Sequence, residues 1–152
     1  MDLLADHAGS WTGTSGFRFQ AWDELAVRPA TARVALAAGG HVTTVQYTWE
    51  HPDDGPAEGI VAIWAGAETI AAAFWDSWHQ QPEPLAMTGA LVDGVLELEG
   101  TYFEVWRWQL AFDVSDPDRL GFVMRNVVPP EHGDERFAGG PYDVSVADLR
   151  RD

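Results

Sequence analysis

Cysteine and lysine are both absent from this chain of 152 residues. The first absence excludes disulfides, thiol nucleophiles and thiolate metal sites. The second excludes Schiff-base chemistry and a lysine nucleophile. Long hydrophobic runs are missing too, since none approaches the roughly 20 residues of a membrane-spanning helix. The start of the chain, Met1–His7, is acidic where a secretory signal would be basic. We therefore expect a cytoplasmic protein that does not enter a membrane.

Positive charge is scarce, because 24 acidic residues outnumber nine arginines and give a formal net charge of −15. Nucleic-acid binding rests on a basic footprint, so we expect no nucleic-acid partner. The five histidines are scattered along the chain. A zinc site needs several ligands at close spacing, so we assign no metal ligand. The sequence leaves any cofactor unknown.

Helical periodicity is rare, and short alternating segments separated by turn signals take its place. About ten strands at a spacing of roughly 8–12 residues indicate an all-β barrel or sandwich. We favour a single antiparallel up-and-down β-barrel, because closure removes the strand edges that such apolar segments would expose. One domain, 1–152, with a short helical turn at 2–7, fits this length. The expected strands are 9–19, 30–38, 41–51, 58–66, 69–79, 85–92, 95–103, 104–114, 120–128 and 142–150.

The stretch Thr69–His79 is apolar on both faces, so we interpret it as one long strand covered on both sides. A two-residue hairpin at Ala67-Glu68 would place Trp64 opposite Ala71 and Ile60 opposite Trp75. That face, continued by His79, would form an aromatic wall typical of a small-molecule pocket. The other face would need cover as well, and we predict a homodimer that buries it. The sequence does not decide which face points into the barrel.

Candidate ligand-binding residues follow from this interpretation: Tyr47, Trp49, Trp64, Trp75, His79, Arg107 and Arg125. His79 either contacts a ligand or is an exposed residue at a strand end. Inward arginines would form a hook for an anion, whereas outward arginines would balance nearby acidic residues. We assign no catalytic residue.

Asp76 admits two interpretations. If it is buried, it must be paired with Arg107 or Arg125 or be protonated. Otherwise it reaches solvent near the rim of the barrel. Together with His79 it could form an acid–base pair, which keeps an enzyme as an alternative. By contrast, Glu97 and Glu99 alternate with leucines and are expected to form a solvated stripe.

Gly9-Ser-Trp11 follows the short helical turn and opens the first strand. This pattern resembles the start of the calycin superfamily, which contains lipocalins, fatty-acid-binding proteins and nitrobindin-type haem proteins. The resemblance implies that Trp11 closes one end of the barrel and that Arg150 or Arg151 packs across its ring by a cation–π contact. The Arg-x-Tyr pair that holds a carboxylate in fatty-acid-binding proteins is missing from the last strand.

Two functions follow from the barrel and its family resemblance. The first is the binding of a small apolar or amphipathic ligand inside the barrel, and we favour it. The second is haem binding as in nitrobindin-type relatives, which would need one inward histidine. An interaction protein that uses an apolar outer face is a further alternative.

Overall fold

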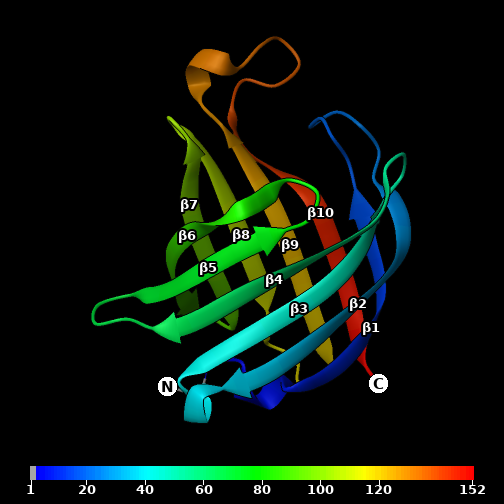
Figure 1. The fold of residues 1–152 in the computed structure, drawn as a ribbon. Coiled ribbons are helices and arrows are strands. Elements are labelled where there is room, and N and C mark those ends of the chain that lie inside the picture. The colour runs from blue at the N-terminus through cyan, green and yellow to red at the C-terminus, as the bar shows by residue number, and fades with distance from the viewer. Residues whose placement is uncertain (1–2) are drawn as a thin grey trace.

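Ten antiparallel strands account for most of residues 3–152, the part of the chain that the computed structural model describes (Figure 1). Each strand pairs with its neighbours in sequence, and β1 pairs with β10, so the sheet closes on itself. The predicted all-β fold and closed up-and-down barrel are confirmed. The strands are β1 (Gly9–Phe17), β2 (Ala26–Ala37), β3 (Val42–His51), β4 (Gly55–Ala65), β5 (Ile70–Asp76), β6 (Gln80–Val92), β7 (Val95–Phe103), β8 (Trp106–Asp113), β9 (Arg119–Val128) and β10 (Gly140–Arg151).

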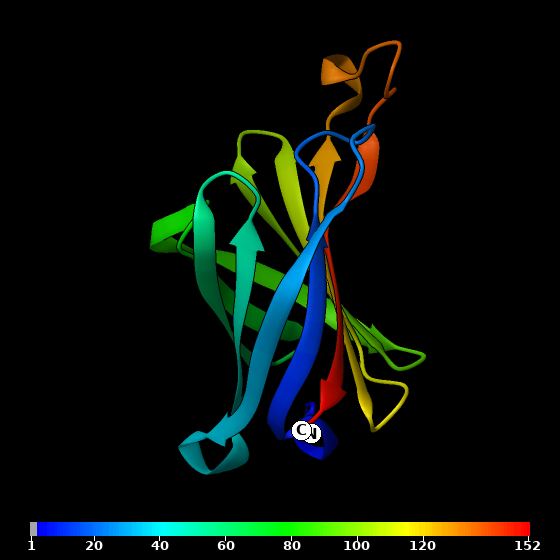
Figure 2. The same cartoon turned by 90° about the vertical axis from the view of Figure 1, so that its right-hand side faces the viewer.

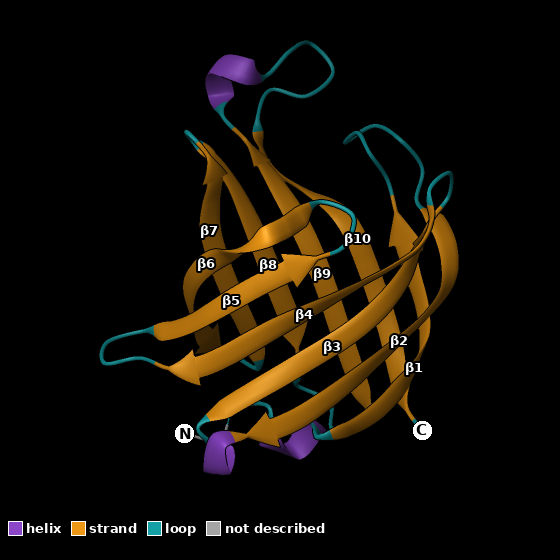
Figure 3. Cartoon of the chain, viewed as in Figure 1, coloured by secondary structure: helices purple, strands orange, loops and turns teal. Residues whose placement is uncertain are grey.

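Helical structure within these residues is limited to three short 3-10 turns (Figure 3). They are η1 (Ala5–His7), η2 (Ala38–Gly40) and η3 (Pro130–His132). The turn predicted at 2–7 corresponds to η1, although Asp2 lies outside the described residues. The turn η1 lies at one end of the barrel, and the loop between β9 and β10 lies at the other end. The end that carries η1 is the closed end, and the end that carries the β9–β10 loop is the open end (Figure 1).

Side chains alternate between the interior and the solvent along each strand, as the pleat requires. In β3 the side chains of Val45, Tyr47 and Trp49 are buried, whereas Gln46 and Thr48 are exposed. The same alternation fixes the register at two hairpins. Asp93-Gly94 adopts positive φ at both positions, 52° and 79°, as a type I′ hairpin turn needs.

The pairing predicted for the Ala67-Glu68 hairpin is also confirmed. Ile60 lies opposite Trp75, and Trp64 lies opposite Ala71. The prediction that 69–79 is one strand is wrong, however, because β5 ends at Asp76. The Asp76 carboxylate accepts a hydrogen bond of 2.9 Å from the backbone N–H of Trp78, which folds the chain into an Asx-type turn.

The segment Gln80–Pro84, predicted to break the sheet, instead begins β6. The residue before a proline favours extended backbone, so Pro82 and Pro84 keep the segment strand-like. Their missing N–H groups cost little on the β7 side, because β6 pairs with β7 only from Thr88 to Val92. The first residues of β6 can therefore include Pro82 and Pro84 and still form part of the strand.

Trp11 plugs the closed end and is 0% exposed. The Arg151 guanidinium carbon lies 4.5 Å from the centre of its ring, which is the contact predicted from the sequence. The His7 ring stacks on Trp11 with 5.4 Å between ring centres. Arg151 also donates hydrogen bonds to the carbonyl oxygens of Asp6, Ala8 and Pro117 at 2.7–3.0 Å. Figure 2 shows η1 and the end of β10 side by side at this end.

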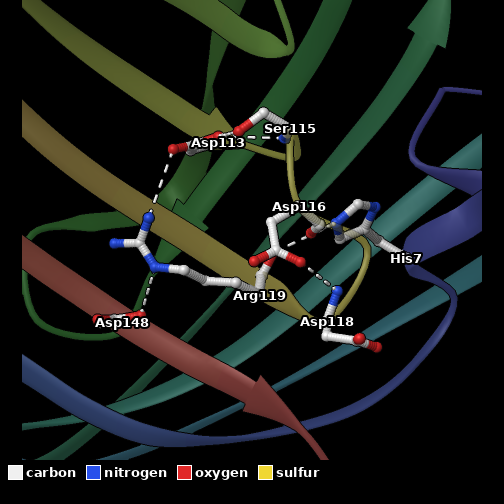
Figure 4. A network of polar contacts seen from close by, with 7 residues as sticks. All are labelled: His7, Asp113, Ser115, Asp116, Asp118, Arg119 and Asp148. Atoms are coloured by element: carbon white, nitrogen blue, oxygen red, sulfur yellow. Dashed lines mark hydrogen bonds and ion pairs between the residues drawn. The ribbon is translucent and has the colours of Figure 1, made fainter.

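A network of polar contacts (Figure 4) includes His7, which stacks on Trp11. His7 Nε2 donates to the carbonyl oxygen of Asp116 at 3.0 Å. Arg119 pairs with Asp148 at 2.8 Å and with Asp113 at 3.6 Å. These ion pairs are half-exposed, so each contributes little on its own. The His7 hydrogen bond connects the β8–β9 turn to η1, and the Arg119 ion pairs connect β9 to β8 and β10.

Large apolar side chains fill the barrel above Trp11. Phe112 and Phe122 stack with 4.4 Å between ring centres, and Tyr47 meets Phe122 edge-on at 5.0 Å. Leu96, Leu98 and other leucines complete a packed middle. The hollow that the sequence predicts along the barrel is therefore confined to its open end.

Candidate functional site

A cavity of about 380 Å³ occupies the open end of the barrel, and we call it the mouth cavity. Its walls come from β1, β7, β8, β9 and β10, from the loops after β1 and β9, and from the turn after β5. Ligand pockets in proteins commonly measure about 300–1,000 Å³, so this space suits a small molecule. The lining residues are Phe17, Phe19, Gln20, Ala21, Trp22, Trp78, Tyr102, Trp106, Trp108, Asn126, Val128, His132, Asp134, Phe137, Tyr142 and Val144.

The β9–β10 loop extends beyond the strands at the open end (Figure 3), and aromatic side chains of this loop line the cavity. His132 in η3 lies 5.2 Å from Trp106 between ring centres, and Phe137 meets Tyr142 edge-on at 5.5 Å. These contacts attach the loop to the rims of β8 and β10. The loop thus forms part of the cavity wall.

Trp78 separates the mouth cavity from the packed interior. Its ring meets Trp49 edge-on at 5.7 Å and Phe17 at 5.4 Å, and it stacks on His51 at 4.9 Å. Its indole N–H donates to Asp54 at 2.8 Å. Since its backbone N–H is also bonded to Asp76, Trp78 is held at both ends.

Asp76 is the buried polar centre beneath Trp78, with 1% of its surface exposed. Its carboxylate accepts hydrogen bonds from the Tyr47 hydroxyl at 2.5 Å and from the Trp49 indole N–H at 3.1 Å. Burial raises the pKa of Tyr47 well above its usual value, and the nearby Asp76 charge and hydrogen bond raise it further. The interpretation of Asp76 at the solvent rim is wrong. Its pairing with an arginine is wrong as well, because neutral donors satisfy it.

His79 lies beside this network and is half-buried. Its ring centre is 4.7 Å from that of Trp108 and 5.8 Å from that of Phe74. Burial lowers the pKa of His79 below its usual value, and Asp76 opposes that shift. The imidazole is therefore neutral near pH 7 and serves as an aromatic neighbour of Trp108.

A scan against protein-family models and a search of curated proteins both find no match to this chain. Within residues 3–152, no three histidine or acidic side chains gather closely enough to hold a metal ion. No helix in the same range is both long and apolar enough to cross a membrane. The geometry of the site therefore carries the functional argument.

The predicted site residues divide between the inside and the outside of the barrel. Tyr47, Trp49 and His79 lie inside, close to the floor of the mouth cavity. Trp64 is 38% exposed, and Trp75 is half-buried on the same outer face. The aromatic wall expected from these two tryptophans thus does not line the interior. Val61, Ile63, Ile70, Ala72, Phe74 and Trp78 occupy the inner face instead.

Arg107 and Arg125 also point outward, so the second of the two alternatives holds and no inward anion hook is formed. Arg107 pairs with Glu99 at 2.8 Å, and Arg125 pairs with Asp143 at 2.9 Å. The expectation that Glu97 and Glu99 form an outer stripe is confirmed by the inward burial of Leu96 and Leu98. These arginines balance acidic neighbours on the surface.

A larger hollow of about 740 Å³ lies on the outer face of β1 to β5, and we call it the outer groove. Thr12, Thr31, Thr48 and Ser77 line it, and Trp75 contributes its apolar part. It is a shallow surface feature bounded by side chains that alternate with the core. It shares no lining residue with the mouth cavity.

Sequence reasoning missed most of the mouth cavity, including Phe17, Trp78, Trp106 and Trp108. Alternation could have found the two tryptophans of β8, Trp106 and Trp108. Trp106 and Trp108 share a face with the core residues Leu110 and Phe112, and Trp78 continues the inner face of Phe74. What sequence could not supply was the choice of face on β5.

Proposed function

We propose that this protein binds a small apolar or amphipathic molecule in the mouth cavity. The observation that carries the proposal is the space of about 380 Å³ at the open end, with a wall made largely of aromatic rings. Such rings contribute large apolar contact areas at low conformational cost, and a few polar groups among them fix a ligand's orientation. Tyr102, Asn126 and His132 supply those polar groups.

Membership of the calycin superfamily is part of this proposal. It is supported by the closed ten-strand barrel and by the Trp11–Arg151 contact at one end. In that architecture the opposite end is the natural opening for a ligand. The mouth cavity lies at that opposite end.

Haem fits these residues less well. An axial ligand would have to be a histidine presented to the cavity. His132 is the one histidine in the cavity lining, and it sits on an exposed loop against Trp106. His79 is packed among Phe74, Trp78 and Trp108 and is not part of the lining.

An enzyme built on Asp76 and His79 has little geometric support. Both carboxylate oxygens of Asp76 accept hydrogen bonds from Tyr47, Trp49 and Trp78. A general base must instead reach the proton that it abstracts. The carboxylate is better explained as the anchor of the cavity floor.

The test is a titration of the purified protein with a neutral apolar fluorophore, N-phenyl-1-naphthylamine, with saturable enhancement as the expected result. Val128→Trp would fill the cavity from β9 and should abolish that enhancement. Val123→Trp places the same ring on the outer face of the same strand and should leave it intact. Equal behaviour of both variants would refute the proposal. A Soret band on addition of haemin would favour the haem alternative.

A further inference from the structure

One donor in the wall of the mouth cavity has no acceptor. Trp108 is 9% exposed, and its indole N–H is buried without a hydrogen-bond partner, alone in this respect among the side-chain nitrogen and oxygen atoms of the described residues. Three other indoles of the barrel donate hydrogen bonds. Trp11 donates to the His7 carbonyl oxygen at 2.9 Å, Trp49 to Asp76 at 3.1 Å and Trp78 to Asp54 at 2.8 Å.

A buried donor without an acceptor is disfavoured, so native proteins rarely retain one without a reason. Asn126 lies directly across from Trp108 in the sheet, but its side-chain oxygen accepts from the Tyr102 hydroxyl at 2.8 Å. Trp108 is part of the cavity wall, but its Nε1 has no accessible surface, so the ring must turn toward the cavity before an acceptor on a bound molecule can complete its hydrogen bonding.

Charge restricts what that acceptor can be. No arginine is part of the cavity lining, and the one ionisable acid there is Asp134. Asp134 accepts from the backbone N–H groups of Arg136 and Phe137, which fixes its carboxylate beside the opening. The net charge of −15 on the chain disfavours an anionic ligand, although Arg136 lies over the Trp22 ring and Arg18 over the Tyr142 ring at the edge of the cavity. A neutral oxygen acceptor is not repelled by these negative charges.

We infer that the ligand is a neutral, largely aromatic molecule with a carbonyl-type oxygen that accepts a hydrogen bond from Trp108. The inference rests on the proposed function and specifies its ligand class. The rings of Trp78, Trp106 and Phe17 contact the apolar body, and the Trp108 N–H sets its orientation. A carboxylate such as that of a fatty acid is excluded from this class.

The experiment compares 2-acetylnaphthalene with 2-ethylnaphthalene, which has a similar shape but no carbonyl. The wild-type protein should bind the ketone roughly three- to tenfold more tightly, as one net hydrogen bond predicts. Trp108→Phe should remove this preference and leave the affinity for the hydrocarbon within about twofold. Trp106→Phe changes a ring in the same wall and should retain the preference.

A second measurement does not depend on the variant's stability. In the wild-type protein, the indole ¹H–¹⁵N resonance of Trp108 should move downfield with the ketone and not with the hydrocarbon. Equal binding of both probes without that movement would overturn the inference while leaving the proposed function intact. Binding of neither probe would overturn both. Tighter binding of 2-naphthoate than of the ketone would overturn the neutral ligand class.

Discussion

Tyr47 on β3 donates a hydrogen bond to Asp76 on β5 across the intervening strand, at 2.5 Å. Gly59 on β4 is the paired residue of both, so the three positions form one row across the sheet. The phenol ring passes over Gly59, and a β-carbon there would overlap the Tyr47 hydroxyl. The contact therefore depends on a residue that contributes no side chain.

Gly59→Ala should displace the Tyr47 ring from Asp76 and lower the free energy of unfolding by about 1–3 kcal/mol, the usual cost of overpacking. Urea unfolding followed by tryptophan fluorescence measures this change. Gly16→Ala is the matched control in β1, because its new methyl group meets Leu25 Cβ at 3.1 Å, a tight contact that a small shift relieves, without the overlap found at Gly59. Equal losses in both variants would contradict the role of Gly59.

Tyr47→Phe should cost about 1.5–3 kcal/mol near pH 7, as expected for a hydrogen bond to a charged group. Its effect should shrink in alkaline solution. The pKa of Tyr47 is raised by burial and by Asp76, so above the ordinary value of 10.0 the unfolded state loses its proton first. Wild-type stability then falls as pH rises, and that slope should be shallower in the variant. Denaturation midpoints between pH 7 and 11 would show whether the curves converge.

His79→Gln should change how the free energy of unfolding depends on pH in acidic solution. Burial lowers the pKa of His79, so below its ordinary value of 6.5 the unfolded state binds the proton more readily than the folded state. Wild-type stability therefore declines as pH falls through that window, and the variant should decline less. His41→Gln changes an exposed histidine and serves as the control. Parallel curves for wild type and His79→Gln would refute this expectation.

Arg151→Ala should destabilise the barrel by about 2–3 kcal/mol, because it removes a cation–π contact and hydrogen bonds to carbonyl oxygens of η1 and the β8–β9 turn. Arg150→Ala, on an exposed side chain one residue earlier, should change stability by less than about 0.5 kcal/mol. Thermal unfolding of both variants gives the comparison. Arg151→Lys should not restore the lost stability, since an ammonium group cannot reproduce the planar set of N–H donors of a guanidinium group.

The homodimer predicted from the sequence stays a prediction, and the outer face of β4 and β5 is where it would form. Ile60, Trp64 and Trp75 lie on that face, half-buried or exposed. Sedimentation velocity of the wild-type protein should then show a dimer that Trp64→Arg converts to a monomer. Leu91→Arg, at another exposed apolar site, should leave it dimeric. A wild-type monomer at every concentration would remove this prediction.

The sequence predicted the strand count, the barrel and the register of the Ala67-Glu68 hairpin because alternation and turn residues are local signals. The turn after Asp76 was missed, since it depends on that side chain capping the backbone of Trp78. The site was predicted only in part. Both faces of β5 are apolar, so periodicity could not decide whether Trp75 or Trp78 points inward. That choice is set by Asp76, whose donors come from a strand more than twenty residues earlier.

The seam between β1 and β10 joins segments far apart in the sequence, and Ser15 and Ser145 share a hydrogen bond across it at a separation of 130 residues. During translation, β1 leaves the ribosome long before β10 exists. The nascent chain must therefore carry an open strand edge until synthesis of the last strand is complete, a state that is prone to aggregation. Ring closure of this kind is a late and slow event, because the entropy of the whole loop is lost before the final contacts form.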